Sequence, residues 1–258
     1  MHNVITIKAF KDNYIWLIKD SQSQHCILVD PGDAKPVLRI LEKEKLTVDA
    51  ILVTHHHEDH VAGIKELLTH FKKEIPIYSK DKLFSGSNRV VDAQILSFFE
   101  NRLIFNVMFV AGHTLDHVAY YNQESLFCGD TLFSAGCGRV MEGTYAQMFT
   151  SLQRITQLDD GIKVYCAHEY TQQNLIFALH LEPNNNALRL YMQKVAKLRQ
   201  QGLASVPSTL GIEKIINPFL RCEQRSLQNA LQAQLGEEIH DALHCFTKLR
   251  RYKDVFIC

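Results

Sequence analysis

Short apolar runs rich in β-branched residues, separated by turns, occupy the first two-thirds of the chain, and such runs predict β-strands. The clearest are 15–18, 26–29, 50–53, 103–110, 125–128 and 163–166. Between them, residues 34–44 and 61–71 place apolar side chains three or four positions apart, which predicts amphipathic helices. Strands and helices that alternate in this way predict a fold of the α/β class.

The strand signals stop after about His168. From there the pattern predicts helices around 173–181, 186–200 and 226–233, with Pro and Gly residues between them. We therefore expect a mixed α/β domain over residues 1–168, followed by a smaller all-helical domain over residues 169–258.

Composition narrows the possible partners. The chain has 258 residues, 46% of them hydrophobic, and can bury a core without disulfides. Its 28 Lys and Arg balance 28 Asp and Glu, so bulk charge favours neither nucleic acid nor an anionic membrane as a partner. Seven scattered cysteines with no Cys-x-x-Cys pair favour reduced thiols. Because no secretory leader or long apolar span is evident, we expect a cytoplasmic protein, monomeric by default.

Four of the thirteen histidines fall within the segment His55 to His60, directly after an apolar run. In an extended stretch, residues two apart point to the same side, so His55 and His57 can bind one cation while His56 points away. Asp59 and His60 follow at the start of the predicted helix, where they are better placed for a second cation. This loop therefore predicts part of each of two metal sites.

A zinc-type site needs about four ligands, and a catalytic one keeps a position for water, so further residues must contribute. Three later apolar runs lead to His113, Asp130 and His168. If the ends of these strands gather at one edge of the sheets, they complete two metal sites. One ion then takes His55, His57 and His113, the other takes Asp59, His60 and His168, and Asp130 bridges the two.

A single histidine at the end of a strand is more often a surface or core residue than a metal ligand. The histidines outside the cluster are therefore expected to be structural; these are His117, His180, His240 and His244. Within the loop, His56 and Glu58 are expected to support the ligands or to be exposed.

The segment Thr54-His55-x-His57-x-Asp59-His60 resembles the signature of the metallo-β-lactamase superfamily. Later segments resemble the glyoxalase II family, the hydroxyacylglutathione hydrolases, in order and spacing, and the likeness runs from Asn13-Tyr14 nearly to the end of the chain. They are Gly112-His113-Thr114, residues 127–133, residues 136–139, Glu142-Gly143-Thr144, residues 167–171 and Arg250-Arg251-x-Lys253-Asp254.

This resemblance implies an αββα metallo-β-lactamase sandwich with the metals at one edge, followed by the helical domain. It also implies glutathione-binding roles for Arg139, Tyr170, Arg250 and Lys253. From Glu169 onward, 11 Lys and Arg stand against 8 Asp and Glu, and this basic surplus suits an anionic tripeptide.

The implied activity is the hydrolysis of S-(2-hydroxyacyl)glutathione, such as S-D-lactoylglutathione, to glutathione and D-lactate, the second step of methylglyoxal detoxification. We expect a hydroxide held between the two metal ions to attack the thioester carbonyl. Asp130 would bridge the ions, and Asp59 would orient the nucleophile as well as bind metal. The expected cofactors are two divalent ions, zinc first, with iron or manganese as alternatives.

Two residues depart from the family pattern. Asp116 stands where relatives usually have Gly, which adds a carboxylate near the metals, and Met141 stands where relatives tend to have an aromatic residue near the substrate. Two other classes of function stay open. One is another enzyme of the same fold, acting on a lactam, lactone or phosphodiester, or a mononuclear iron dioxygenase. The other is a binding module that keeps metals only for stability.

Overall fold

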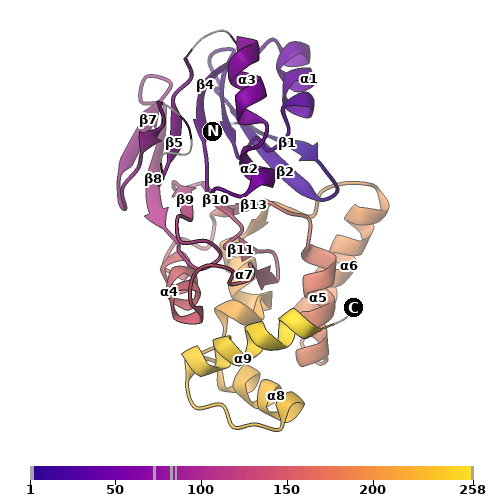
Figure 1. The fold of residues 1–258 in the computed structure, drawn as a ribbon. Helices are drawn as coiled ribbons and strands as arrows, with labels where there is room; N and C mark the ends of the chain where they lie inside the picture. The colour runs from indigo at the N-terminus through magenta and orange to yellow at the C-terminus, as the bar shows by residue number, and fades with distance from the viewer. Residues whose placement is uncertain (1–2, 72–73, 82–83, 85, 257–258) are drawn as a thin grey trace. The chain divides into compact units, whose positions relative to one another are not determined.

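The computed structural model describes residues 3–71, 74–81, 84 and 86–256 of the chain (Figure 1). The chain forms two compact units. The first unit comprises residues 1–109 and 116–129, and the second comprises residues 110–115 and 130–258. The two compact units thus have other boundaries than the point near residue 168 where the sequence pattern changes. The domain boundary expected at 168/169 stays a prediction.

The first unit contains a six-stranded sheet in the order β1-β2-β3-β4-β5-β6. The first three strands are antiparallel, and β3 to β6 are parallel. The strands are β1 Asn3–Ala9, β2 Asn13–Lys19, β3 His25–Val29, β4 Thr47–Leu52, β5 Ile77–Ser79 and β6 Asn88–Arg89.

Helices α1 (Ala34–Glu44) and α3 (Ile64–Phe71) lie over this sheet (Figure 1). Six of the seven residues of β2 are buried, because the strand is covered on both faces. Its Ile15 and Leu17 belong to the core that includes residues of α1 and α3. The intervening Trp16 is also buried and, by the alternation of side chains along a strand, points to the opposite face.

A second group of strands in the first unit forms an antiparallel array in the order β10-β9-β8-β7. The hydroxyl of Tyr120, in β9, lies 2.9 Å from the carbonyl oxygen of Val53 and 2.8 Å from that of Tyr78. This contact joins β9 to the residue that follows β4 and to the middle of β5, so the two groups of strands pack against each other. The strands are β7 Ile95–Phe98, β8 Leu103–Phe109, β9 Val118–Tyr121 and β10 Ser125–Gly129.

The helix expected over residues 61–71 is interrupted. A short helix, α2 (Glu58–Val61), ends before Gly63, and α3 begins after it. A Cβ atom on Gly63 would lie 2.5 Å from the carbonyl oxygen of Pro31, so the chain can pass here only as glycine. The break in the helix coincides with this close approach between distant segments, which the local pattern of apolar residues does not reveal.

The second unit consists mainly of helices. Its core includes Leu175 and Ala178 of α5, Leu188 and Val195 of α6, and Ile216 of α7. Strands β11 and β12 pair with each other, as do β13 and β14. The elements are β11 Leu132–Phe133, β12 Gly136–Cys137, α4 Tyr145–Thr156, β13 Lys163–Cys166, α5 Thr171–Leu181, α6 Asn186–Gln200, β14 Ser208–Thr209, α7 Leu210–Ile216, a 3-10 turn Pro218–Leu220, α8 Arg225–Leu235 and α9 Ala242–Val255.

Each of the six predicted strands overlaps an observed one, and α1 has the predicted bounds. The C-terminal region is helical as expected, except for the two-residue strand β14. In the part of the chain that the structure describes, no helix has the length and apolar character needed to cross a membrane.

Candidate metal centre and substrate pocket

The carboxylate of Asp30 anchors the loop that follows β4. Asp30 is buried directly after β3, with a positive φ of 51°. Its Oδ1 accepts a hydrogen bond from the backbone N–H of Thr54 (2.7 Å), and its Oδ2 accepts one from the Thr54 hydroxyl (2.6 Å). Oδ2 also lies 3.0 Å from Nδ1 of His60. One buried carboxylate thus fixes both the start of the histidine loop and α2. We did not predict this role of Asp30 from the sequence. Its position directly after a buried apolar strand could have indicated a functional carboxylate.

The four predicted ligands of the first unit form two pairs. Nε2 of His55 lies 3.1 Å from Nδ1 of His57, and Nε2 of His60 lies 3.7 Å from Oδ2 of Asp59. Two atoms bound at about 2.1 Å to one tetrahedral ion are about 3.4 Å apart. Each pair therefore has the spacing that a shared cation requires, and the pairs are those that the sequence spacing predicts.

Neighbouring side chains hold these ligands in place. The Thr54 hydroxyl lies 3.0 Å from Nδ1 of His55, and Nδ2 of Asn13 donates to Oδ2 of Asp59 at 2.8 Å. Metal-binding imidazoles and carboxylates are generally oriented by such partners, which fix the ring or carboxylate before the ion arrives. Asn13 begins β2, far from the loop in sequence, so the resemblance around Asn13-Tyr14 now has a physical reason.

The residues between and beside the ligands have supporting contacts. Nδ1 of His56 lies 3.0 Å from Oδ1 of Asp116, a buried carboxylate. The unusual Asp116 therefore has a local partner within the first unit. His117 is fully buried and stacks on His55, with ring centroids 4.6 Å apart. Glu58 is exposed.

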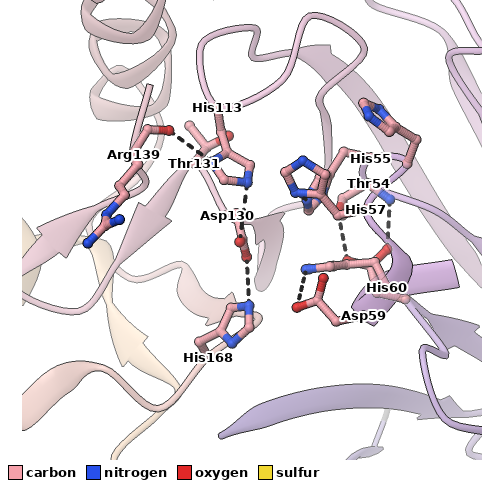
Figure 2. A network of polar contacts seen from close by, with 12 residues as sticks. Thr54, His55, His57, Asp59, His60, His113, Asp130, Thr131, Arg139 and His168 are labelled. Carbon is pink, nitrogen blue, oxygen red and sulfur yellow. Dashed lines mark hydrogen bonds and ion pairs between the residues drawn. The ribbon is translucent and has the colours of Figure 1, made fainter. Parts of the chain in front are cut away.

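In the second unit, Asp130 lies between two predicted ligands (Figure 2). Its Oδ2 is 3.5 Å from Nε2 of His113, and its Oδ1 is 3.4 Å from Nε2 of His168. Nδ1 of His113 donates to the carbonyl oxygen of Arg139 at 2.8 Å, so Nε2 is the nitrogen directed at the carboxylate. These separations are long for hydrogen bonds but match the spacing of two ligands on one ion. Asp130 thus presents one oxygen to each histidine, the arrangement of a carboxylate that bridges two cations.

Glycine at position 138 allows the chain to pass Asp130. A Cβ atom at Gly138 would lie 1.9 Å from the Asp130 carbonyl oxygen and 3.4 Å from Nδ1 of His113. Any side chain here would push the backbone away from both residues. Position 138 therefore requires glycine for steric reasons, while the neighbouring Arg139 supplies a cation to the pocket.

A pocket of about 400 Å³ in the second unit brings the metal-type ligands next to cationic side chains. His113 and Asp130 line it, as do all four residues to which the family resemblance assigns glutathione binding. Met141 also lines the pocket and is 64% exposed. The four residues are Arg139, Tyr170, Arg250 and Lys253, and the thiol-bearing Cys137 also lines the pocket.

The aromatic and cationic groups of this pocket are held by their neighbours. The Tyr170 ring stacks on His168, with centroids 4.7 Å apart and 3° between the planes. Nζ of Lys253 donates to the carbonyl oxygen of Gln173 at 3.3 Å and lies 4.8 Å from the centre of the Phe177 ring. A bound anion would therefore meet groups that are already oriented, which lowers the entropic cost of binding.

The buried thiol of Cys137 is not an activated nucleophile. Burial raises its pKa to about 11, even though the nearby Arg250 guanidinium favours the thiolate. At neutral pH roughly one thiol in 10,000 would be ionised. The pocket therefore suits a reaction in which water, rather than a cysteine, attacks the substrate.

Residues 10–168 match the model of the metallo-beta-lactamase superfamily. A solved structure of ETHE1 from Myxococcus xanthus has the same fold, with a TM-score of 0.64 at 22% identity, covering 92% of this chain and 92% of that one. The predicted fold class is confirmed. This fold, together with the groups of His and Asp side chains that could hold a metal ion, indicates binuclear metal binding.

Residues 169–256 match the model of the hydroxyacylglutathione hydrolase C-terminus. A hydroxyacylglutathione hydrolase from Psychromonas ingrahamii is 62% identical, over 99% of this chain and 100% of the relative. One from Photobacterium profundum is 49% identical over the same shares. The chain belongs to the hydroxyacylglutathione hydrolase family, as its motifs predict.

Proposed function

We propose that this chain is a thioester hydrolase that cleaves S-(2-hydroxyacyl)glutathione, such as S-D-lactoylglutathione, to glutathione and D-lactate. Its reaction would be the second step of methylglyoxal detoxification. The observation that carries the proposal is the pocket of the second unit, where His113 and Asp130 share one cavity with three cationic side chains. In a glutathione thioester the reacting carbonyl and the anionic peptide belong to one small molecule. Its site therefore needs metal ligands and cationic side chains within the length of that molecule.

We propose that two divalent ions are bound, zinc in the first place, with iron or manganese as alternatives. The donor set fits this proposal, because five imidazoles and two carboxylates suit these metals. Closed structural zinc sites are instead often rich in thiolates. His55, His57 and His113 would hold one ion, Asp59, His60 and His168 would hold the other, and Asp130 would be a ligand of both.

Bound ions of this kind supply Lewis-acid chemistry, since they lower the pKa of water toward about 7 and polarise a carbonyl oxygen. Asp130, with one oxygen toward each of His113 and His168, would keep the two halves of the centre at a fixed separation. Asp59, held by Asn13, would orient the attacking water as well as bind metal. That water would attack as hydroxide, after giving its proton to solvent. The attack forms a C–O bond to the thioester carbon, breaks the C–S bond and releases the hydroxy acid and the glutathione thiolate.

Three cations, Arg139, Arg250 and Lys253, would recognise the glutathione part. This part carries two carboxylates and one ammonium group, so it is a net anion that matches a cationic pocket. Arg250 is 3% exposed, so its charge is partly desolvated and attracts an anion more strongly than it would in water. Tyr170 would add a ring against the peptide.

The other enzymes of this fold remain the main alternative. A simple lactam or lactone lacks an anionic peptide for three cations to bind, so the pocket favours the peptide thioester over these two classes. A phosphodiester is itself an anion, so the assay decides between it and the thioester. The matched test compares S-D-lactoylglutathione with the same acyl group on N-acetylcysteamine, and with a β-lactam and a phosphodiester. We expect the glutathione ester to be hydrolysed much faster than the N-acetylcysteamine ester, no hydrolysis of the β-lactam or the phosphodiester, and loss of all activity on chelation. Equal rates on both thioesters would contradict glutathione recognition, and cleavage of another class alone would contradict the substrate assignment.

We also propose that the chain acts as a monomer in the cytoplasm, on a small-molecule substrate and without a nucleic-acid or membrane partner. Light scattering on the purified protein tests the first point, and a mass twice that of one chain would contradict it. Cell fractionation tests the second.

A further inference from the structure

We infer that Asp254 is a positioning residue, which holds Arg139 and Arg250 in the orientation that binds the glutathione part of the substrate. The inference rests on the proposed function and deepens it. Neither the pattern of the metal loop nor the pocket lining assigns a role to this carboxylate.

One oxygen of Asp254 meets both guanidinium groups. Its Oδ1 lies 3.0 Å from Nη2 of Arg250 and 3.8 Å from Nε of Arg139. Arg250 and Asp254 are four positions apart on α9, whereas Arg139 follows β12. A single carboxylate therefore joins the last turn of α9 to the segment that carries the third cation of the pocket.

The two arginines depend on this carboxylate to different degrees. Arg250 is buried, donates to the carbonyl oxygen of Cys137 at 2.8 Å and stacks on Phe219, with its guanidinium carbon 5.1 Å from the ring centre. The Arg139 side chain is 73% exposed. Long exposed side chains lose several rotamers when they are ordered. The ion pair with Asp254 favours those rotamers that keep Arg139 beside Arg250.

Arg139 also connects this cation pair to the metal-type ligands. Its carbonyl oxygen accepts the hydrogen bond from Nδ1 of His113, while its side chain meets Asp254. The backbone of Arg139 thus contacts the end of the pocket that has the metal-type ligands. Its side chain lies at the other end, where a carboxylate of glutathione would bind. Fixing this side chain therefore sets where the glutathione part lies relative to the thioester carbonyl.

Helix stability does not explain a carboxylate at position 254. A negative charge in the last turn of a helix opposes the helix dipole, and an Arg followed four positions later by an acid is the less favourable order for such a pair. Charge alone also acts against binding, since Asp254 reduces the attraction of the two arginines for an anionic substrate. Positioning and bare electrostatics therefore make opposite predictions for the removal of this charge.

The experiment compares wild type with Asp254→Asn and Asp254→Ala. Steady-state hydrolysis of S-D-lactoylglutathione gives KM and kcat, and calorimetry gives the Kd of S-methylglutathione, which has the peptide but no thioester. We expect KM and Kd to rise roughly five- to tenfold, with kcat within about twofold of wild type. The matched control is Glu238→Gln, which removes a charge from an exposed site of the same unit and should change neither constant.

An unchanged or lower KM in both Asp254 variants would overturn the inference, because that is the result expected from charge alone. An equal loss on the N-acetylcysteamine thioester would also overturn it, since that substrate lacks the peptide. Asp254→Asn keeps the shape of the side chain, so it serves if Asp254→Ala does not fold. A wild-type protein that neither hydrolyses the glutathione ester nor binds S-methylglutathione would instead contradict the proposed function itself.

Discussion

The substitution Asp30→Asn tests whether the buried carboxylate behind the histidine loop organises the metal-binding side chains. Asparagine has the shape of aspartate and adopts the positive φ of this position readily, so the backbone itself is not strained. Only the charge and one acceptor oxygen are lost. The change therefore isolates the contacts to Thr54 and His60.

The magnitude follows from the three contacts. The bond from the Thr54 N–H can persist to the amide oxygen, but as a neutral bond it loses about 1 kcal/mol. The amide nitrogen could donate to the Thr54 hydroxyl, which can accept, but the Nδ1–H of His60 would lose its acceptor, and a buried donor without an acceptor costs about 2 kcal/mol. We therefore expect the free energy of unfolding of the metal-free protein to fall by about 3 kcal/mol. Metal affinity should fall by roughly 10- to 100-fold.

Urea unfolding of the metal-free protein and competition with a chromophoric chelator measure the two effects. The control is Asp33→Asn, three positions further on, where the side chain caps α1 by accepting from the backbone N–H of Lys35. Because Asn caps a helix as well as Asp does, this variant should change stability by less than about 0.5 kcal/mol. Asp30→Asn with wild-type stability and wild-type metal retention would refute the reasoning.

Three further changes have defined outcomes. Gly138→Ala should lower stability by more than about 3 kcal/mol in urea unfolding, because its Cβ would meet the Asp130 carbonyl oxygen at 1.9 Å; a stable variant would show that the chain gives way there. Asp130→Ala should lower kcat by more than about 100-fold and reduce the metal content, since even the partners of metal ligands contribute up to that much; normal turnover would contradict the bridging role. The Arg102 guanidinium holds the pKa of the Asp20 carboxyl well below its ordinary value, so this pair stabilises the fold above about pH 4 and the contribution is lost as the pH falls. Asp20→Asn should therefore make the urea midpoint less sensitive to acid, and an unaltered pH profile would contradict this.

Local patterns were sufficient for several elements. Helix α1 could be placed to the residue because its apolar period is regular and Asp33 caps it. Helix α4 was missed although its signal is present, since Thr144 and Gln147 form a capping box before buried Met148, Leu152 and Ile155. Helix α4 could therefore have been predicted from the sequence alone.

Other features depend on contacts between distant positions, which spacing along the chain does not reveal. Asp30 meets Thr54 across 24 positions, and Asn13 meets Asp59 across 46. The interruption between α2 and α3 arises where Gly63 passes Pro31. The types and the order of the metal-type ligands could therefore be predicted, but the residues that orient them could not.

The most direct test of the central claim is turnover of S-D-lactoylglutathione by metal-free protein to which zinc is added stepwise, with bound metal measured on the same samples. We expect no turnover without metal, a rise in rate as zinc is added, and two ions bound per chain at saturation. Full turnover by metal-free protein, or two bound ions with no turnover, would contradict the assignment of this chain as a binuclear glutathione thioester hydrolase.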